Sequence, residues 1–366
     1  MSPGAKPLRS RAESFWAALE NADEHSAVAQ VNEALDHGLA PEDVLLEVIA
    51  PAQRRVGVRW AENRLTVAQE HAATAVSDRA VTAVAAHPAA RVPARLGRVT
   101  VACADGEWHT LPARLVAEVL RLRGWHVDFL GAHVSTRQLV SHLHSTGPDA
   151  VALSCSLPVR LPVAHAAVTA CRGAGVPVLA GGAGFGPGGR YARLLGADAW
   201  AGSARGAAER LAAGIAPPSV LPQTAEEALP HLADREHALV EEASRRLVDE
   251  VMAVLPERFP RSRECTGRRR EYTAEDLHRV VEYLVAALYV DDPGLFEGFT
   301  VWTGRIMAAR NLPVQALSAV LETMAGAFRE LPRASAYIAA ARAALGRELR
   351  SSSPESTPGR GNGSAG

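Results

Sequence analysis

A glutamate and a histidine two residues apart stand in a short polar loop that could bind a metal ion. The loop covers residues 105–112, DGEWHTLP, and a helix is predicted from Ala113. One ring nitrogen of His109 can ligate a metal while the other donates a hydrogen bond to the Glu107 carboxylate. A lone loop histidine is more often solvated than ligated, so this interpretation depends on what the neighbouring loops offer.

Two further loops offer groups that suit a bulky ligand. Residues 154–158 read SCSLP and place two serine hydroxyls after a predicted strand. Residues 181–184 read GGAG, where the missing Cβ atoms let a bulky planar ligand approach the backbone. We therefore predict a binding rim formed by Glu107, Trp108, His109, Thr110, Ser154, Ser156, Leu157, Gly181, Gly182 and Gly184.

Strand-rich runs that alternate with amphipathic helical stretches position these loops. Such runs are predicted at residues 98–104, 126–130, 149–155, 176–180 and 198–201, a pattern typical of βαβ units on a parallel sheet. This predicts a doubly wound, flavodoxin-like (Rossmann-type) α/β domain, a class that binds ligands beyond the carboxyl ends of its strands. The three loops follow the first, third and fourth strands, so they should lie on one rim.

Helical periodicity characterises the chain on both sides of this domain. Residues 1–92 are predicted to form a four-helix bundle with breaks at residues 38–41 and around Pro51, and the sheet domain follows at 93–216. One buried bundle face is marked by Val44, Leu45, Val48 and Ile49.

The composition changes twice more after the sheet domain. Residues 217–235 include PPSVLP, which predicts a linker. Residues 236–350 show only helical periodicity, and residues 351–366, rich in serine, glycine and proline, are predicted to be disordered. The buried face of the third domain is marked by Leu277, Val280, Val281, Leu284 and Leu288. The fold class is therefore α/β plus all-α.

The charge balance argues against broad classes of partner. With 39 basic and 40 acidic side chains the net charge is -1, which gives no overall electrostatic reason to bind nucleic acid or an anionic membrane. We recognise no signal peptide or membrane-spanning run. Cys103, Cys155, Cys171 and Cys265 lack metal-type spacing, and the first three fall in apolar stretches, as buried thiols do. We expect a cytoplasmic protein with no direct nucleic-acid or membrane partner.

The middle domain resembles the cobalamin-binding domain of methionine synthase and the mutases, whose loops read Asp-x-His-x-x-Gly, Ser-x-Leu and Gly-Gly. The resemblance implies that His109 is the lower ligand of cobalt and that Glu107 takes the place of the aspartate, as in the light-sensing branch of the family. It also implies that Ser154 and the pair Gly181-Gly182 accept the nucleotide tail. Two positions depart from the pattern, since Pro112 replaces the glycine and Ser156 replaces the leucine.

A second motif lies in the predicted bundle, where Trp60 is followed after nine residues by Glu70-His71. This spacing resembles the Trp-x9-Glu-His motif of the adenosylcobalamin photoreceptors that repress carotenoid genes. The resemblance implies that Trp60, Val67, Glu70 and His71 cap the adenosyl group, and that light cleaves the cobalt-carbon bond without substrate turnover. Those photoreceptors commonly carry a cobalt-ligating histidine directly after the tryptophan, where this chain has Ala61.

The third domain resembles a globin-type or phycobilin-type helical sensor. A fusion of the two parts resembles the photocobilins, which use cobalamin together with the bilin biliverdin. The resemblance implies a non-covalently bound bilin, and from its needs for aromatic walls and cations we expect contacts from Tyr272, Trp302, Arg305 and Arg269.

The helical pattern begins at about Ala12, so fewer than about fifteen residues precede it, too few for a winged-helix DNA-binding domain. We therefore expect output through an unknown signalling partner or through a homo-oligomer, a dimer or tetramer in the dark. Two alternatives stay open. A corrinoid carrier for methyl transfer would use the same Glu107-His109 loop, and a haem-based gas sensor would rest on His278.

Overall fold

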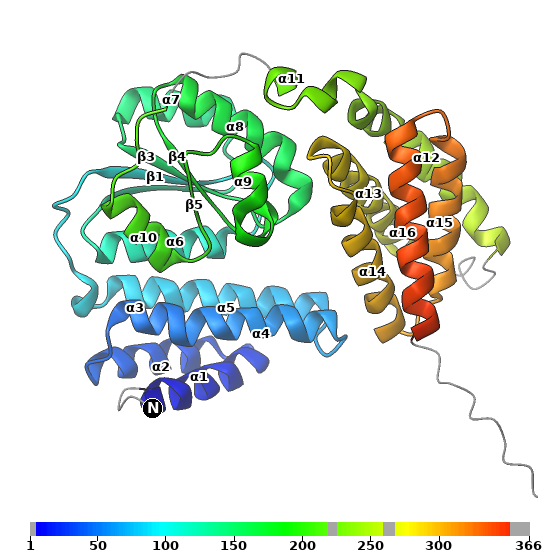
Figure 1. The fold of residues 1–366 in the computed structure, drawn as a ribbon. Helices are drawn as coiled ribbons and strands as arrows, with labels where there is room; N and C mark the ends of the chain where they lie inside the picture. The colour runs from blue at the N-terminus through cyan, green and yellow to red at the C-terminus, as the bar shows by residue number, and fades with distance from the viewer. Residues whose placement is uncertain (1–4, 219–224, 259–267, 352–366) are drawn as a thin grey trace, which may run out of the picture. The chain divides into compact units, whose positions relative to one another are not determined.

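The computed structural model describes residues 5–218, 225–258 and 268–351 (Figure 1). The chain divides into two compact units, one up to Asp234 and one from Arg235. None of the described helices is long and apolar enough to cross a membrane.

A five-stranded parallel sheet organises the middle of the first unit. Its strand order is β2-β1-β3-β4-β5, the flavodoxin-like doubly wound order. The strands are β1 Arg98–Cys103, β2 His126–Gly131, β3 Ala150–Ser154, β4 Val178–Gly181 and β5 Ala199–Ala201. The five strands predicted from the sequence are confirmed to within two residues at each end. All strands run the same way, so the loops after β1, β3 and β4 meet at one edge.

Helices cover both faces of the sheet (Figure 1). On one face α6 packs against α10, and on the other α7 packs against α8. These helices are α6 Thr110–Leu122, α7 Thr136–Thr146, α8 Leu161–Gly173, α9 Arg190–Leu194 and α10 Ala204–Ala212. On β1 the alternate residues Val99, Val101 and Cys103 belong to the same buried cluster as α6 and α10.

The predicted helical bundle is formed by α1 Ala5–Glu20, α2 Glu24–Asp36, α3 Pro41–Asp43, a π-helical turn Val44–Ile49, α4 Ala50–Ala61 and α5 Val67–Ala86. The predicted break at residues 38–41 is confirmed, with Gly38 in the left-handed region (φ +83°). The predicted break around Pro51 is wrong. The preceding turn is π-helical, with Ala50 N donating to Leu45 O, and Pro51 stands in the first turn of α4, where its missing N–H costs nothing.

The bundle and the sheet domain share one hydrophobic core. Ion pairs also connect the bundle to the sheet domain. Glu42 accepts two hydrogen bonds from Arg123, at 2.7 and 2.9 Å, and one from Arg205 at 3.1 Å. Arg205 also donates to Asp43 and Glu47, both at 2.7 Å. We call these five residues the Arg205 clamp, and it ties α3 and the π-helical turn to α6 and α10.

The predicted linker contains two short helical turns, α11 Ala225–Ala228 and a 3-10 turn Pro230–Asp234, which bury Leu229 and Leu232. The second unit is helical throughout its described residues. It comprises α12 Glu236–Arg258, α13 Arg268–Tyr289, α14 Pro293–Ala309, α15 Val314–Ala327 and α16 Pro332–Ser351. The buried face predicted on α13 is confirmed: its five apolar residues are at most 7% exposed.

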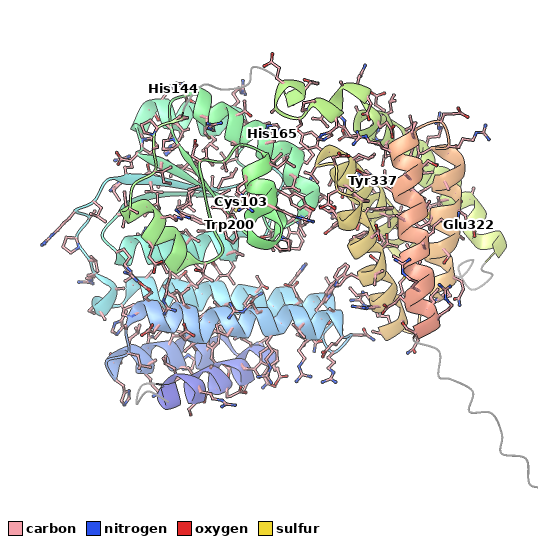
Figure 2. The ribbon with its side chains drawn as sticks, in the orientation of Figure 1. Cys103, His144, His165, Trp200, Glu322 and Tyr337 are labelled. Atoms are coloured by element: carbon pink, nitrogen blue, oxygen red, sulfur yellow. The ribbon has the colours of Figure 1, made fainter. Side chains whose placement is uncertain are left out.

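Figure 2 labels Cys103, at the end of β1. Cys103, Cys155 and Cys171 are all buried, which confirms the prediction made for them, while Cys265 lies outside the described residues. Burial, together with the Glu107 charge, raises the pKa of Cys103 to about 12. This thiol therefore stays protonated at neutral pH.

Candidate functional site

The Glu107 carboxylate joins two of the three predicted loops. Its side chain is fully buried and accepts four hydrogen bonds. Oε1 accepts from the backbone N of His109 at 2.9 Å and contacts His109 Nδ1 at 2.5 Å. Oε2 accepts from the backbone N atoms of Ser156 and Leu157 at 2.8 and 3.0 Å. The loop after β1 and the loop after β3 are thus held together by one carboxylate.

This carboxylate is ionised at neutral pH. Burial alone would raise the pKa of Glu107, but the hydrogen bonds from the His109 side chain and backbone, the His109 charge and the Ser156 backbone lower that pKa to about 2. An ionised carboxylate only accepts hydrogen bonds, so Nδ1 of His109 must carry a proton. In the neutral imidazole the other nitrogen, Nε2, then carries the lone pair that a metal ligand must present.

Two further aromatic rings, those of Trp108 and His71, lie next to the Glu107-His109 pair. The Trp108 indole stacks on the His109 imidazole, with centroids 3.9 Å apart and planes at 28°. The ring of His71 also meets Trp108, edge-on, with centroids 6.2 Å apart and planes at 76°. Thr110 opens α6, and its backbone N donates to Trp108 O at 2.9 Å. A bundle residue is therefore brought beside the loop that carries the candidate ligand.

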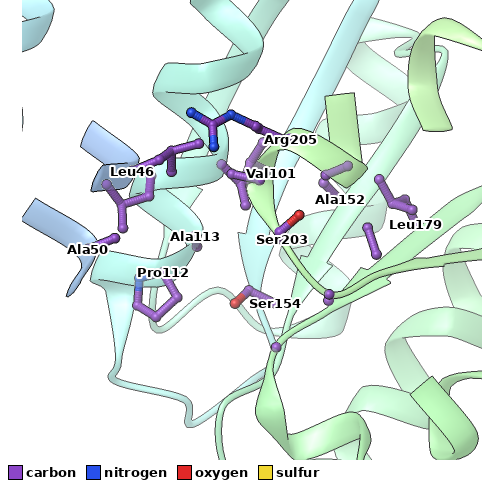
Figure 3. Close-up of a pocket in the computed structure, with 18 of the residues that line it drawn as sticks. Leu46, Ala50, Val101, Pro112, Ala113, Ala152, Ser154, Leu179, Ser203 and Arg205 are labelled. Atoms are coloured by element: carbon purple, nitrogen blue, oxygen red, sulfur yellow. The ribbon is translucent and has the colours of Figure 1, made fainter. Parts of the chain in front are cut away.

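A cavity of about 390 Å³ opens at the ends of the strands (Figure 3). Ser154, Gly181 and Gly182, all predicted for the binding rim, line it. From the bundle it is lined by Leu46, Glu47, Ala50 and Arg54, and from the segment after β5 by Gly202, Ser203 and Arg205. Its inner wall is made mainly of alanine, valine and leucine side chains, so it suits an apolar ring.

Three residues of the predicted rim act through the backbone. Ser156 and Leu157 face Glu107 with their N–H groups. Gly184 does not line the cavity; its N donates to Cys155 O at 2.9 Å, and a Cβ there would lie 2.8 Å from Cys155 Sγ. At Gly182 two features favour glycine over other residues. The residue lines the cavity, and its backbone has a φ of +105°, which side chains with a Cβ rarely adopt.

The cap motif spans the turn between α4 and α5. Trp60 is partly buried near the end of α4, and Val67, the first residue of α5, is 55% exposed. Glu70 accepts a hydrogen bond from Thr74 Oγ1 at 2.9 Å, and its other oxygen lies 3.4 Å from His71 Nε2. Val67 and the 48% exposed Trp108 leave apolar surface open on both domains, as at a binding face.

Sequence reasoning missed the cavity wall beyond β4. Ser203 caps α10 by accepting from Gly206 N at 3.1 Å, and a serine two residues after the fifth predicted strand was a signal that could have found it. Leu46 and Ala50 gave no such signal, because they reach the cavity only once the bundle has docked.

In the second unit, Trp302 on α14 is 44% exposed and belongs to an aromatic cluster with Tyr283 and Phe299. Tyr283 and Phe299 stack at 3.6 Å and 7°, and Phe299 and Trp302 lie 6.0 Å apart. Arg305 forms two hydrogen bonds to Glu348, at 2.7 and 3.1 Å. The side chains of the other two candidate bilin contacts, Tyr272 and Arg269, lie outside the described residues.

The candidate haem ligand His278 lies at the contact between α12 and α13. Its Nδ1 is 3.0 Å from Ser244 Oγ, and its side chain is 51% exposed.

Comparison with known families identifies two matching segments. Family models described as B12 binding domain match residues 97–212 and, separately, residues 11–85. The chain therefore contains B12-binding domains in both its sheet domain and its bundle, and these support a B12 cofactor.

Two curated proteins of Myxococcus xanthus are homologous to this part of the chain. The HTH-type transcriptional repressor CarA is 32% identical over 189 residues, 50% of this chain and 60% of that protein. The HTH-type transcriptional repressor CarH is 36% identical over 148 residues, 39% of this chain and 46% of that protein. The match thus spans about half the length of each relative. Among solved structures, the monomethylamine corrinoid protein of Methanosarcina barkeri overlaps 55% of this chain and 96% of its own at 18% identity, with a TM-score of 0.49.

Proposed function

We propose that this protein is a light sensor that binds adenosylcobalamin between the bundle and the sheet domain, with His109 as the lower cobalt ligand. The observation that carries this proposal is the buried Glu107 carboxylate holding Nδ1 of His109, which leaves Nε2 to ligate. When bound, adenosylcobalamin supplies a cobalt-carbon bond that green or blue light cleaves.

The cavity at the strand ends suits the nucleotide tail of this cofactor. Because His109 takes the lower position on cobalt, the tail must lie elsewhere, and the cavity is lined by Ser154, Gly181 and Gly182. The Ser154 hydroxyl is one of the polar groups that line it (Figure 3). The two glycines keep the wall open, and bundle residues such as Ala50 close the opposite side.

The cap would report the loss of the adenosyl group. Trp60 offers an indole face for an adenine ring, and Glu70 a carboxylate for ribose hydroxyls. Once these contacts are lost, the equilibrium between two positions of the bundle shifts. The size of the shift is the difference in contact free energy between the two positions, typically a few kcal/mol. Output then passes through a change in a homo-oligomer or an unknown signalling partner in the cytoplasm, without substrate turnover and without direct contact to nucleic acid.

A second chromophore is part of this proposal. The aromatic cluster of the half-buried Tyr283 and Phe299 with the exposed Trp302 offers the ring surface that a bilin such as biliverdin needs, on a globin-like or phycobilin-like helical domain. Arg305 is already paired with Glu348, so binding a bilin propionate there requires an exchange of partners.

The lower-ligand loop would equally serve a corrinoid carrier for methyl transfer, so the test must separate the two upper ligands. Purified protein is mixed in the dark with adenosylcobalamin or methylcobalamin and passed through gel filtration. We expect adenosylcobalamin to be retained, and Trp60→Ala to weaken retention of adenosylcobalamin more than that of methylcobalamin. Leu96→Ala removes an apolar side chain that is 47% exposed and outside the site, and serves as the control. Retention of methylcobalamin alone, with no effect of Trp60→Ala, would favour the carrier.

A further inference from the structure

Trp108 is an exposed tryptophan between the two residues of the candidate ligand pair. Its side chain is 48% exposed, although tryptophan is among the largest apolar side chains. Its indole nevertheless has a defined place, because it stacks on His109 with centroids 3.9 Å apart.

The stack supplies a restraint that Glu107 cannot. The contact between Glu107 Oε1 and His109 Nδ1 fixes one atom of the imidazole, and the ring can still rock about that atom. An indole lying against the face of the ring at 28° opposes this rocking. A stack covers the face of an imidazole and leaves the nitrogens at its edge open. The two contacts together therefore aim Nε2 of His109 in one direction.

The same indole is also touched from the bundle. His71 meets it edge-on at 6.2 Å, and His71 is in turn 3.4 Å from the Glu70 carboxylate. A chain of ring contacts thus leads from the cap motif through Trp108 to His109. A displacement of α5 acts on the indole first and on the imidazole through it.

We propose that Trp108 is a positioning residue that aims Nε2 of His109 at cobalt and transmits the position of His71 to this ligand. The inference rests on the proposed binding of cobalamin. A residue that only touched the corrin would contribute affinity without changing how cobalt is ligated, so the two roles differ in a spectroscopic readout.

The test uses the full chain with cob(II)alamin as the probe, and electron paramagnetic resonance to detect a nitrogen ligand on cobalt. Protein labelled with ¹⁵N-histidine changes the nitrogen splitting and so identifies histidine as the ligand. We expect wild type and Trp108→Phe, which keeps a stacking ring, to be ligated by histidine. Trp108→Ala should lose most of this signal and bind about ten- to a hundredfold more weakly, the usual cost of removing a group that orients a ligand. His71→Ala should lose part of the signal.

Leu96→Ala, on an exposed apolar residue outside the site, controls for folding and should retain the full signal. Full histidine ligation in Trp108→Ala would overturn the inference, and weaker binding with an unchanged spectrum would show that Trp108 is a cofactor contact only. Wild-type protein that binds cob(II)alamin without a histidine signal, or does not bind it, would overturn the proposed function and this inference with it.

Discussion

Replacing Glu107 by glutamine tests the geometry of the ligand pair most sharply. The carboxylate uses Oε1 toward His109 and Oε2 toward Ser156 and Leu157, and both sides present donors. A glutamine amide has one oxygen and one NH₂ group, so in either orientation one side faces the NH₂ and loses its acceptor. Two of the four hydrogen bonds are therefore lost in Glu107→Gln if the NH₂ faces Ser156 and Leu157, and one is lost if it faces His109 and the imidazole changes its tautomer.

The magnitude follows from the number and charge of these bonds. Hydrogen bonds to a charged group contribute about 1.5–3 kcal/mol each, so losing one should lower the free energy of unfolding by roughly 1.5–3 kcal/mol and losing two by roughly 3–6 kcal/mol. A second effect concerns the ligand itself. If the NH₂ faces Nδ1 of His109, that nitrogen must accept, the ring proton moves to Nε2, and Nε2 can no longer ligate.

The assay is urea unfolding of the cofactor-free protein together with cobalamin titration followed by absorption. We expect weaker cobalamin binding by about ten- to a hundredfold in Glu107→Gln. Glu107→Asp keeps the charge and should recover part of both losses, while Glu20→Gln, on an exposed carboxylate of α1, should change stability by less than about 0.5 kcal/mol. Wild-type stability and histidine ligation in Glu107→Gln would refute this reasoning.

Three further predictions concern the cavity, the clamp and the second unit. Ala50→Phe should fill part of the cavity and weaken adenosylcobalamin binding about tenfold, with little effect on cobinamide, which lacks the nucleotide tail; equal losses in a titration of both would contradict the assignment of the cavity. The Arg123 hydrogen bonds hold the pKa of Glu42 below its ordinary value of 4.5, so its ionised form stabilises the fold above that pH. Glu42→Gln should therefore lower the free energy of unfolding by about 1 kcal/mol at pH 7. In a pH series of urea unfolding, the difference from wild type should disappear as the pH falls through the folded pKa of Glu42, and a pH-independent difference would argue against the ion pairs. Trp302→Ala should weaken biliverdin retention about fivefold in a gel-filtration assay, and unchanged retention would place any bilin elsewhere.

The sheet was predictable because short β-rich runs and helical periodicity are local signals. The five strands and the loops that carry Glu107, Ser154 and Gly181 follow from such runs. The helix through Pro51 was not predictable by the same means, because a π-helical turn leaves no mark in the apolar spacing.

Contacts between distant parts of the chain could not be predicted from the sequence. Arg205 pairs with Glu42 across 163 residues and with Glu47 across 158, and no local sequence pattern indicates which residue is the partner. The role of the loop after β3 was also hidden, because Ser156 and Leu157 act through backbone N–H groups that every residue but proline carries.

In the proposed sensor, light acts on a cobalamin held by His109 and changes the assembly of the protein. The most direct measurement is the mass of the assembly in solution, with adenosylcobalamin bound, before and after green light, for wild type and His109→Ala. We expect a change in absorption and in assembly for wild type, and neither a retained cofactor nor a change in assembly for His109→Ala. A wild-type assembly that is the same in the dark and after illumination, with its cobalamin photolysed, would contradict the sensor, and unaltered binding by His109→Ala would contradict the ligand.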